Sequence, residues 1–212
     1  MKIVTENYPE SIVALPSQGQ HIVAHHTTDE IVVYQAYKAS IANFAVKNQQ
    51  LGGSEYSYNR MSWIKPNFLW MMFRCGWAEK ENQERVLAIW MAKNDFDGLL
   101  QNAVLSSFDS RYYVDHDSWC KELDMKEVRL QWDPDHDPYG NKLTRRAVQL
   151  GLKGRILEDF GRKDIRLIED ITDFVREQKH LVKTKQLDKL LVPMERVYHP
   201  VDTELRKKIG ID

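Results

Sequence analysis

The groups best suited to chemistry lie in residues 60–77 (RMSWIKPNFLWMMFRCGW), a segment with three tryptophans, three methionines and two phenylalanines. Four of its residues precede a predicted helix: Arg60, Ser62, Trp63 and Lys65. The unpaired N–H groups of a helix N-terminus attract anions, and nearby cations strengthen phosphate binding. An indole can stack on a base or a nicotinamide ring. The segment therefore predicts a site for a ligand that combines phosphate with a planar ring.

The same segment also has a purely structural interpretation. At helical spacing, Phe68 and Met72 lie on one apolar face while Trp70 and Arg74 share another, so most of these side chains are expected in the core. For the four residues before the helix, the alternative is a capped helix with cations on its surface.

Two other segments place polar groups on predicted strands. Residues 31–38 (IVVYQAYK) begin as a β-branched run and end in polar and aromatic groups, including Tyr34, Gln35 and Tyr37. Residues 147–152 (AVQLGL) are an apolar run that carries one polar residue, Gln149. The cations that flank this run are Arg145, Arg146, Lys153 and Arg155. Such groups suit a phosphate-bearing ligand or nucleic acid.

Composition limits the class of protein. With 212 residues, 42% hydrophobic and 29% charged, the chain is expected to form one globular domain over residues 1–192, with residues 193–212 as a tail on its surface. No apolar run is long enough to cross a bilayer and no signal pattern is present, so we expect a cytoplasmic protein with no membrane partner. Cys75 and Cys120 are expected to be reduced, buried thiols. The sequence does not indicate an oligomeric state.

Charge is distributed unevenly along the chain. Residues 1–139 carry 13 Lys/Arg against 19 Asp/Glu, whereas residues 140–212 carry 17 against 12. The basic C-terminal third favours an anionic ligand, although a solvated helix with mixed charges explains the same pattern.

Metal binding is not predicted. Asp133, Asp135 and Asp137 have the one-three-five spacing of a calcium loop, but Pro138 stands where such a loop needs glycine and Thr144 where it needs glutamate. A solvated hairpin loop explains this segment better. The histidines and cysteines lack zinc spacing.

Hydrophobic periodicity and turn residues predict alternating strands and helices. The expected strands are residues 21–25, 31–37, 85–91, 128–132, 147–152 and 165–168. The expected helices are residues 40–49, 65–74, 95–105, 154–160 and a long one at 170–191. Residues 106–119 are expected to form a loop.

Several of these motifs, in this order, resemble a known family. YQAYK, NRMSWIKPNFLWMMFRCGWA, ERVLAIWM, VRLQWDPDHD and RRAVQLGL are similar to the domain of unknown function 4291 (DUF4291) family over roughly residues 20–180. The long WIKPNFLWMM motif is the most specific part. The family name carries no activity, so this resemblance implies membership alone.

The order of elements also resembles the ADP-ribosyltransferase fold. That resemblance implies an α+β protein with a split, mainly antiparallel β-sheet core and flanking helices, to which the sequence adds the long C-terminal helix. Three strand positions hold NAD in such enzymes. Gln35 falls where the first is usually His or Arg, and Ser62 or Trp63 where the second is Ser or Tyr. Gln149 falls where the third is usually Glu.

The departures at two of these positions affect the expected chemistry. A glutamine can orient a ribose hydroxyl but cannot act as a base, which argues against transfer to a protein side chain. Divergent members of such folds act on nucleic acids or phosphorylated RNA. The cations beside Gln149, namely Arg145, Arg146 and Lys153, would then face the acceptor.

Two main hypotheses follow. The first is an NAD-using transferase without a metal, in which Gln35 and Gln149 are catalytic and Trp63 lies under the nicotinamide. Its other nucleotide-binding residues would be Tyr34, Tyr37, Arg60, Ser62 and Lys65, with Arg60 and Lys65 on the pyrophosphate. The second is a non-catalytic module that binds nucleotides or nucleic acid through Trp63, Tyr37 and the basic C-terminal third. A fold that only scaffolds other molecules is a third possibility.

Overall fold

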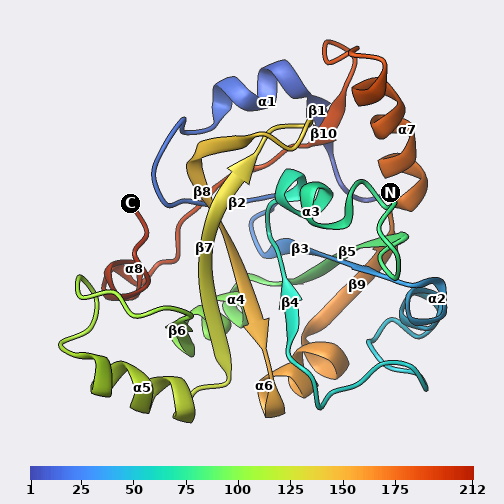
Figure 1. Ribbon diagram of the computed structural model, residues 1–212. Helices are drawn as coiled ribbons and strands as arrows, with labels where there is room; N and C mark the ends of the chain where they lie inside the picture. The colour runs from blue at the N-terminus through green and yellow to red at the C-terminus, as the bar shows by residue number, and fades with distance from the viewer.

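Two β-sheets whose strands run in different directions form the frame of the molecule (Figure 1). The structure is a computed structural model that describes residues 1–212. The first sheet is antiparallel and has the order β3 (Glu30–Tyr37), β5 (Arg85–Ala92), β9 (Ile165–Asp170). The second has the order β4 (Ser62–Ile64), β8 (Lys142–Leu152), β7 (Val128–His136), β6 (Ala103–Leu105), and only the β6–β7 pair is parallel.

The two sheets are joined at one point between β3 and β4. The backbones of Tyr34 and Lys65 exchange two hydrogen bonds, of 2.7 and 3.2 Å, in an antiparallel bridge. Beyond this bridge β3 and β4 separate, and their side chains line the gap, across which the hydroxyls of Tyr37 and Ser62 are 3.2 Å apart. The strands therefore form one interrupted sheet with a split beside Tyr34.

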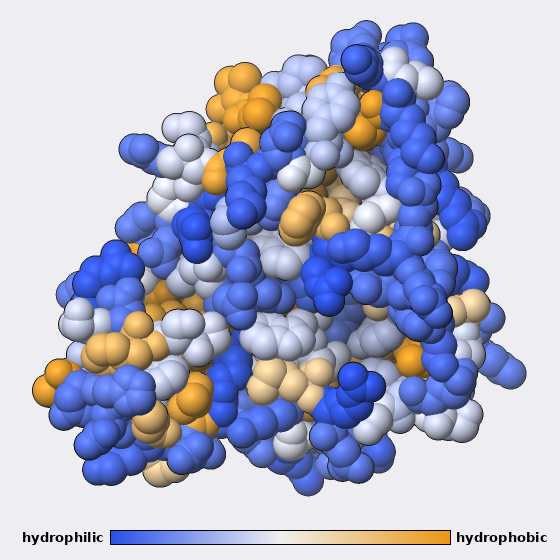
Figure 2. Space-filling view, in the orientation of Figure 1, coloured by the Kyte–Doolittle hydropathy of each residue, from blue (hydrophilic) through white to orange (hydrophobic).

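Helices surround both sheets (Figure 1). They are α1 (Tyr8–Ala14), α2 (Ala39–Asn48), α3 (Phe68–Cys75), α4 (Lys93–Gln101), α5 (His116–Met125), α6 (Gly154–Asp159), α7 (Thr172–Lys183) and α8 (Thr203–Ile209). A short π-helix, Phe160–Asp164, continues α6. No helix is both long and apolar enough to cross a bilayer. Figure 2 shows a hydrophilic outer face over α7 and an apolar patch over α1, where Val13 is 85% exposed.

Two hydrophobic cores lie on opposite faces of β3 and β5. The alternation of a strand sends Ile31 and Val33 into the larger core between the two sheets, and Val32 and Tyr34 into the smaller core. Phe68 of α3 and Val175 of α7 close the smaller core. Every residue of β3 from Ile31 to Gln35 is consequently buried.

Short strands tie the two ends of the chain together. Strand β1 (Thr5–Asn7) pairs with β10 (Leu191–Pro193), and β2 (Ile22–Ala24) pairs with β11 (Arg196–Tyr198), both antiparallel. Residues 193–212, expected as a surface tail, thus include a strand and the helix α8. Leu205 and Ile209 of α8 lie in the larger core.

The predicted class, α+β with mainly antiparallel sheets, is confirmed. The strands expected at residues 21–25, 31–37, 85–91, 128–132, 147–152 and 165–168 all form, as do the helices at 40–49 and 154–160. Both strands of the β7–β8 hairpin are longer than expected, because the acidic segment continues the ladder as far as His136.

Three expected helices form with different ends, and one expected loop contains a helix. The helix expected at residues 65–74 begins only at Phe68, since Lys65 is held in the bridge to β3. The one expected at 95–105 ends at Gln101, and Ala103–Leu105 forms β6 beside β7. The long helix expected at 170–191 ends at Lys183. The loop expected at 106–119 runs into α5, whose first turn has a capping box.

Candidate ligand-binding site

A cavity of about 190 Å³ lies where β3 and β4 separate. Its walls come from both strands and from α3. The polar and aromatic groups that line it are Gln35, Tyr37, Ser62, Trp63, Lys65, Arg74 and Gln83. Five of these seven were predicted from two separate sequence segments, and the split in the sheet brings them together.

Gln35 lies at the centre of a small hydrogen-bond network. Its Nε2 donates to Ser62 Oγ at 2.8 Å and to the Trp63 carbonyl at 3.2 Å. The hydroxyls of Tyr37 and Ser62 are 3.2 Å apart. Gln35 is only 3% exposed, and its Oε1 is buried with no hydrogen-bond partner. A buried acceptor without a donor is costly, so this oxygen is suited to a ligand N–H.

Lys65 lies in the same wall and is 5% exposed. Its Nζ donates to the Trp63 carbonyl at 3.1 Å, the same oxygen that accepts from Gln35. The pKa of Lys65 is lowered to about 7, mainly by burial and in smaller part by the positive charge of Arg74, while the carboxylate of Asp133 opposes the shift. The amine therefore changes charge near neutral pH and faces both of these charged groups.

A row of polar side chains extends from Trp63 across the outer face of the second sheet. Trp63 pairs with Gly151 on β8, and Gln149 pairs with Gln131 on β7, so alternation places these side chains on one face. The amides of Gln149 and Gln131 donate to the two oxygens of Asp133, at 2.7 and 2.8 Å. Asp133 is thus held by two neutral groups and has no cation partner.

Gly151 leaves room for the Trp63 indole. A Cβ at this position would lie 2.9 Å from Cζ2 of Trp63 and 2.7 Å from the sulfur of Met61. The backbone of Gly151 has ordinary φ, so its lack of a side chain serves packing rather than backbone conformation. The ring of Trp63, which is half-buried, therefore rests on β8 two residues from Gln149.

The predicted anion site at the start of α3 is already filled by the protein. The Phe68 N–H donates to Glu195 Oε1 at 2.8 Å, and Asn67 Nδ2 donates to Glu195 Oε2 at 3.3 Å. Asn67 also caps the helix by accepting from Trp70 N–H at 2.7 Å. Glu195 is buried, and burial raises its pKa well above the usual range. The α3 N-terminus is thus unable to receive a phosphate.

Two predicted nucleotide-binding residues lie outside the cavity. Arg60 is exposed and does not line it. Tyr34 points to the opposite side of β3, where its ring packs on Phe68 with centroids 5.6 Å apart. Only the backbone of Tyr34 contributes to the site, through the bridge to Lys65.

The three predicted acceptor cations have different environments. Arg145 is buried and donates to Asp135 at 2.9 and 2.5 Å and to the Pro16 carbonyl at 2.6 Å, so it cannot contact an acceptor. Arg146 makes one side-chain hydrogen bond, to the Trp132 carbonyl at 2.8 Å. Lys153 is half-buried at the start of α6, away from the cavity.

The acidic residues that resembled a calcium loop face three different partners. Asp133 is bound by the two amides, Asp135 by Arg145, and Asp137 closes the hairpin turn by accepting from the backbone of Tyr139 and Asn141. The expected solvated hairpin loop is therefore correct only for the turn itself. Asp133 and Asp135 belong to β7.

Sequence reasoning missed Asp133, Gln131 and Arg74 as site residues. Asp133 and Gln131 are two residues apart on a strand and therefore share a face, which the alternation could have indicated. Arg74 follows Met71 by three residues on α3, and both line the cavity. No local signal indicated that this helix face would lie against β4.

The fold and site define an α+β protein whose interrupted sheet has a polar, partly buried cavity at its split. Comparison with family models then gives the family: the chain belongs to the domain of unknown function (DUF4291) family, whose model matches residues 21–198. The match confirms the resemblance drawn from the motifs and continues as far as β11. No curated protein matches the chain.

Proposed function

We propose that this protein is an NAD-using ADP-ribosyl transferase whose donor site is the cavity between β3 and β4. The observation that carries the proposal is the convergence of Gln35, Ser62 and Trp63, which the fold resemblance assigns to NAD, on that one cavity. Gln149 lies outside its lining but on the same sheet face as Trp63.

The size of the cavity decides which part of NAD it can hold. Clefts for whole ligands measure roughly 300–1,000 Å³, whereas this cavity measures about 190 Å³. It therefore suits the nicotinamide ring alone. The unpaired Oε1 of Gln35 would accept from the carboxamide N–H, and the Trp63 indole would pack on the ring. The rest of the dinucleotide would lie along the outer face, with Arg74 in place of Arg60 near the pyrophosphate.

Asp133 supplies the carboxylate that the chemistry needs. Breaking the nicotinamide–ribose bond builds positive charge on the sugar, and a fixed negative charge nearby stabilises that state. Gln149 is neutral, but it binds Asp133 at 2.7 Å and holds the carboxylate on the sheet face. In the transfer, a lone pair of the acceptor forms the bond to the ribose carbon and nicotinamide leaves with the electrons of the broken bond. The acceptor proton passes to Asp133 or water.

Calorimetry with NAD tests the proposal, with nicotinamide release followed in the same samples. Wild type should bind NAD saturably, and Trp63→Ala should lose at least ~5-fold in affinity, because stacking contributes roughly 1–3 kcal/mol per ring. Trp119→Ala is the matched control, since Trp119 is also half-buried but lies on α5. It should bind NAD as wild type does.

The same experiment also tests the alternative function, a non-catalytic binding module. If NAD gives no heat while an oligonucleotide binds with steep salt dependence, the transferase is excluded and the non-catalytic binding module replaces it. Binding of NAD without release of nicotinamide, with or without nucleic acid present, would likewise exclude the transferase activity.

A further inference from the structure

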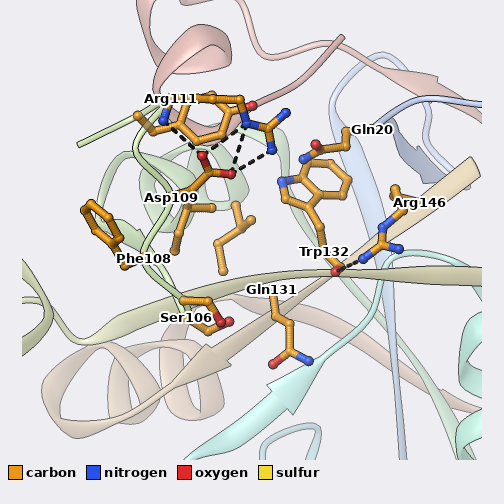
Figure 3. Close-up of a pocket in the computed structure, with 12 residues that line it drawn as sticks. Gln20, Ser106, Phe108, Asp109, Arg111, Gln131, Trp132 and Arg146 are labelled. Atoms are coloured by element: carbon orange, nitrogen blue, oxygen red, sulfur yellow. Dashed lines mark hydrogen bonds and ion pairs between the residues drawn. The ribbon is translucent and has the colours of Figure 1, made fainter. Parts of the chain in front are cut away.

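A second cavity, of about 570 Å³, lies at the edge of β7 on the far side of the second sheet from β4 (Figure 3). Its walls come from β7, from the segment after β6 and from β8. The residues used below are Gln20, Phe108, Tyr112, Gln131, Trp132 and Arg146. None of them lines the cavity between β3 and β4.

The sheet itself creates this opening. Strand β6 pairs with β7 only as far as Leu130, where the Ser106 N–H donates to the Leu130 carbonyl at 2.8 Å. The chain then turns away through Asp109 and Arg111, so the edge of β7 beside Trp132 is left without a neighbouring strand. Figure 3 shows Phe108 and Asp109 on one side of the opening and Trp132 with Arg146 on the other.

The walls combine aromatic rings with side chains that can form hydrogen bonds to the edge of a planar ligand. Phe108 is 37% exposed, and Trp132 and Tyr112 are half-buried. The amide of Gln20 offers both donors and an acceptor. Arg146 donates one N–H to the Trp132 carbonyl, and its other N–H groups are available to a ligand.

The charges around the cavity indicate which of two ligands it favours, a phosphate group or a neutral ring. Arg111 is fully engaged by Asp109, through side-chain bonds of 2.7 to 3.1 Å. A second carboxylate, of Asp212, accepts from the backbone of Gln20 at 2.6 Å. The Asp109–Arg111 pair is neutral as a unit and the nearby Asp212 carboxylate offsets Arg146, so the cavity has no net positive charge to favour a phosphate. Arginine and amide side chains beside aromatic rings instead match the edge and faces of a purine base.

We propose that this cavity binds a purine base, either of a free nucleoside or of an unpaired nucleotide in a single strand. The base packs against the aromatic side chains, and Arg146 with the amide of Gln20 contacts its edge. The phosphates of a strand remain outside the cavity, which makes binding depend on the base more than on salt.

Gln131 separates this cavity from the donor site. It lines the cavity from β7, but its side chain lies on the other face of the sheet, where Nε2 donates to Asp133 at 2.8 Å. The base site therefore lies on the opposite face of β7 from Asp133, and binding of a base there does not depend on the proposed transfer.

Fluorescence anisotropy with labelled oligodeoxyadenylate tests the binding, and an abasic strand of the same length carries equal charge without bases. Wild type should bind the first and not the second. Unlabelled adenosine should compete if free nucleosides are ligands, and only the strand will compete if they are not. Equal binding of the two strands would overturn the proposal.

Matched variants locate the site. Phe108→Ala should weaken oligodeoxyadenylate binding by at least ~5-fold, as loss of one stacking ring requires. Phe73→Ala, at 40% exposure on α3, should have no effect. Arg146→Gln should weaken binding while Arg176→Gln does not. Unchanged binding in both Phe108→Ala and Arg146→Gln would refute the site.

NAD calorimetry on the same variants separates this inference from the proposed function. Phe108→Ala and Arg146→Gln should bind NAD as wild type does. If NAD fails to bind wild type while the base-dependent binding persists, the proposed base site is supported and the proposed transferase function is excluded. If NAD binds but no base-dependent binding is seen, the second cavity is not a base site.

Discussion

The β7–β8 hairpin holds two aspartates in opposite ways. Asp135 is 1% exposed and its charge is matched by Arg145, a buried cation on the partner strand. Asp133, two residues earlier, is half-buried and held only by the amides of Gln131 and Gln149. The first arrangement seals a charge inside the fold, whereas the second keeps a negative charge fixed at a surface and free to act on a ligand.

This difference shows how a carboxylate that stabilises the fold can be distinguished from one that is available to act on a ligand. A buried ion pair is strongly destabilised when one partner is lost, because the other charge has no compensation. A carboxylate held by neutral donors keeps its full charge, and its loss changes the local field more than the fold. The four predictions below test that contrast.

Arg145→Met should have the largest effect on stability. It leaves Asp135 buried without its cation and should lower the free energy of unfolding by ~3–5 kcal/mol. Urea unfolding measures the change. The double variant Arg145→Met with Asp135→Leu should recover much of the lost stability. If Arg145→Met alone were within ~1 kcal/mol of wild type, the ion pair would not be desolvated in the folded protein.

Asp133→Asn should leave the fold nearly unchanged and abolish most activity. The asparagine oxygen still accepts from one amide, and the other glutamine can turn its own oxygen toward the new Nδ2. The charge that stabilises the cationic sugar is gone. The rate of nicotinamide release should fall by roughly 10²–10³, the usual loss when one electrostatic stabiliser is removed. A rate equal to that of wild type would remove Asp133 from the mechanism.

Gly151→Ala should displace the Trp63 indole, because the new Cβ would lie 2.9 Å from it. Overpacking of this kind costs roughly 1–3 kcal/mol, and NAD binding should weaken with it. Gly98→Ala on α4 is the matched control, since a Cβ there meets nothing within 4 Å. That variant should be as stable as wild type or more so, by up to ~1 kcal/mol.

The effect of Lys65 should be smallest near neutral pH and should grow as the pH is raised. The folded state holds the amine uncharged above about pH 7, whereas the unfolded chain keeps it protonated up to the ordinary lysine range. Stability relative to Lys65→Met should therefore rise with pH above about 7, by at most ~1.4 kcal/mol per pH unit. Urea titrations across that range measure it, and a flat difference would show that Lys65 is not desolvated.

Local patterns predicted much of the fold. The β-branched run at Ile31 and the apolar run at Val86 gave β3 and β5, because strands buried on both faces have continuous apolar sequences. The capping box at Asp115 and Ser118 was legible as a helix start, yet the polar composition around it was interpreted as a loop.

Long-range pairing explains most of what could not be predicted. Ala103–Leu105 continues the apolar pattern of α4, and only its pairing with β7 makes it a strand. In the same way, Glu195 fills the start of α3 from a segment far along the chain. The site was predicted where its residues are neighbours in sequence, as in Ser62 and Trp63. Asp133 was missed because its importance depends on its cross-strand neighbours.

The β1–β10 and β2–β11 pairs also bear on how fast the protein folds. Each joins segments separated by nearly the whole chain, and contacts of such high sequence separation carry the greatest loop-closure entropy. They should form last on the folding pathway. Until β10 and β11 are in place, Glu195 cannot cap α3, so the helix that carries Arg74 and Met71 becomes fixed only in the final, slowest step.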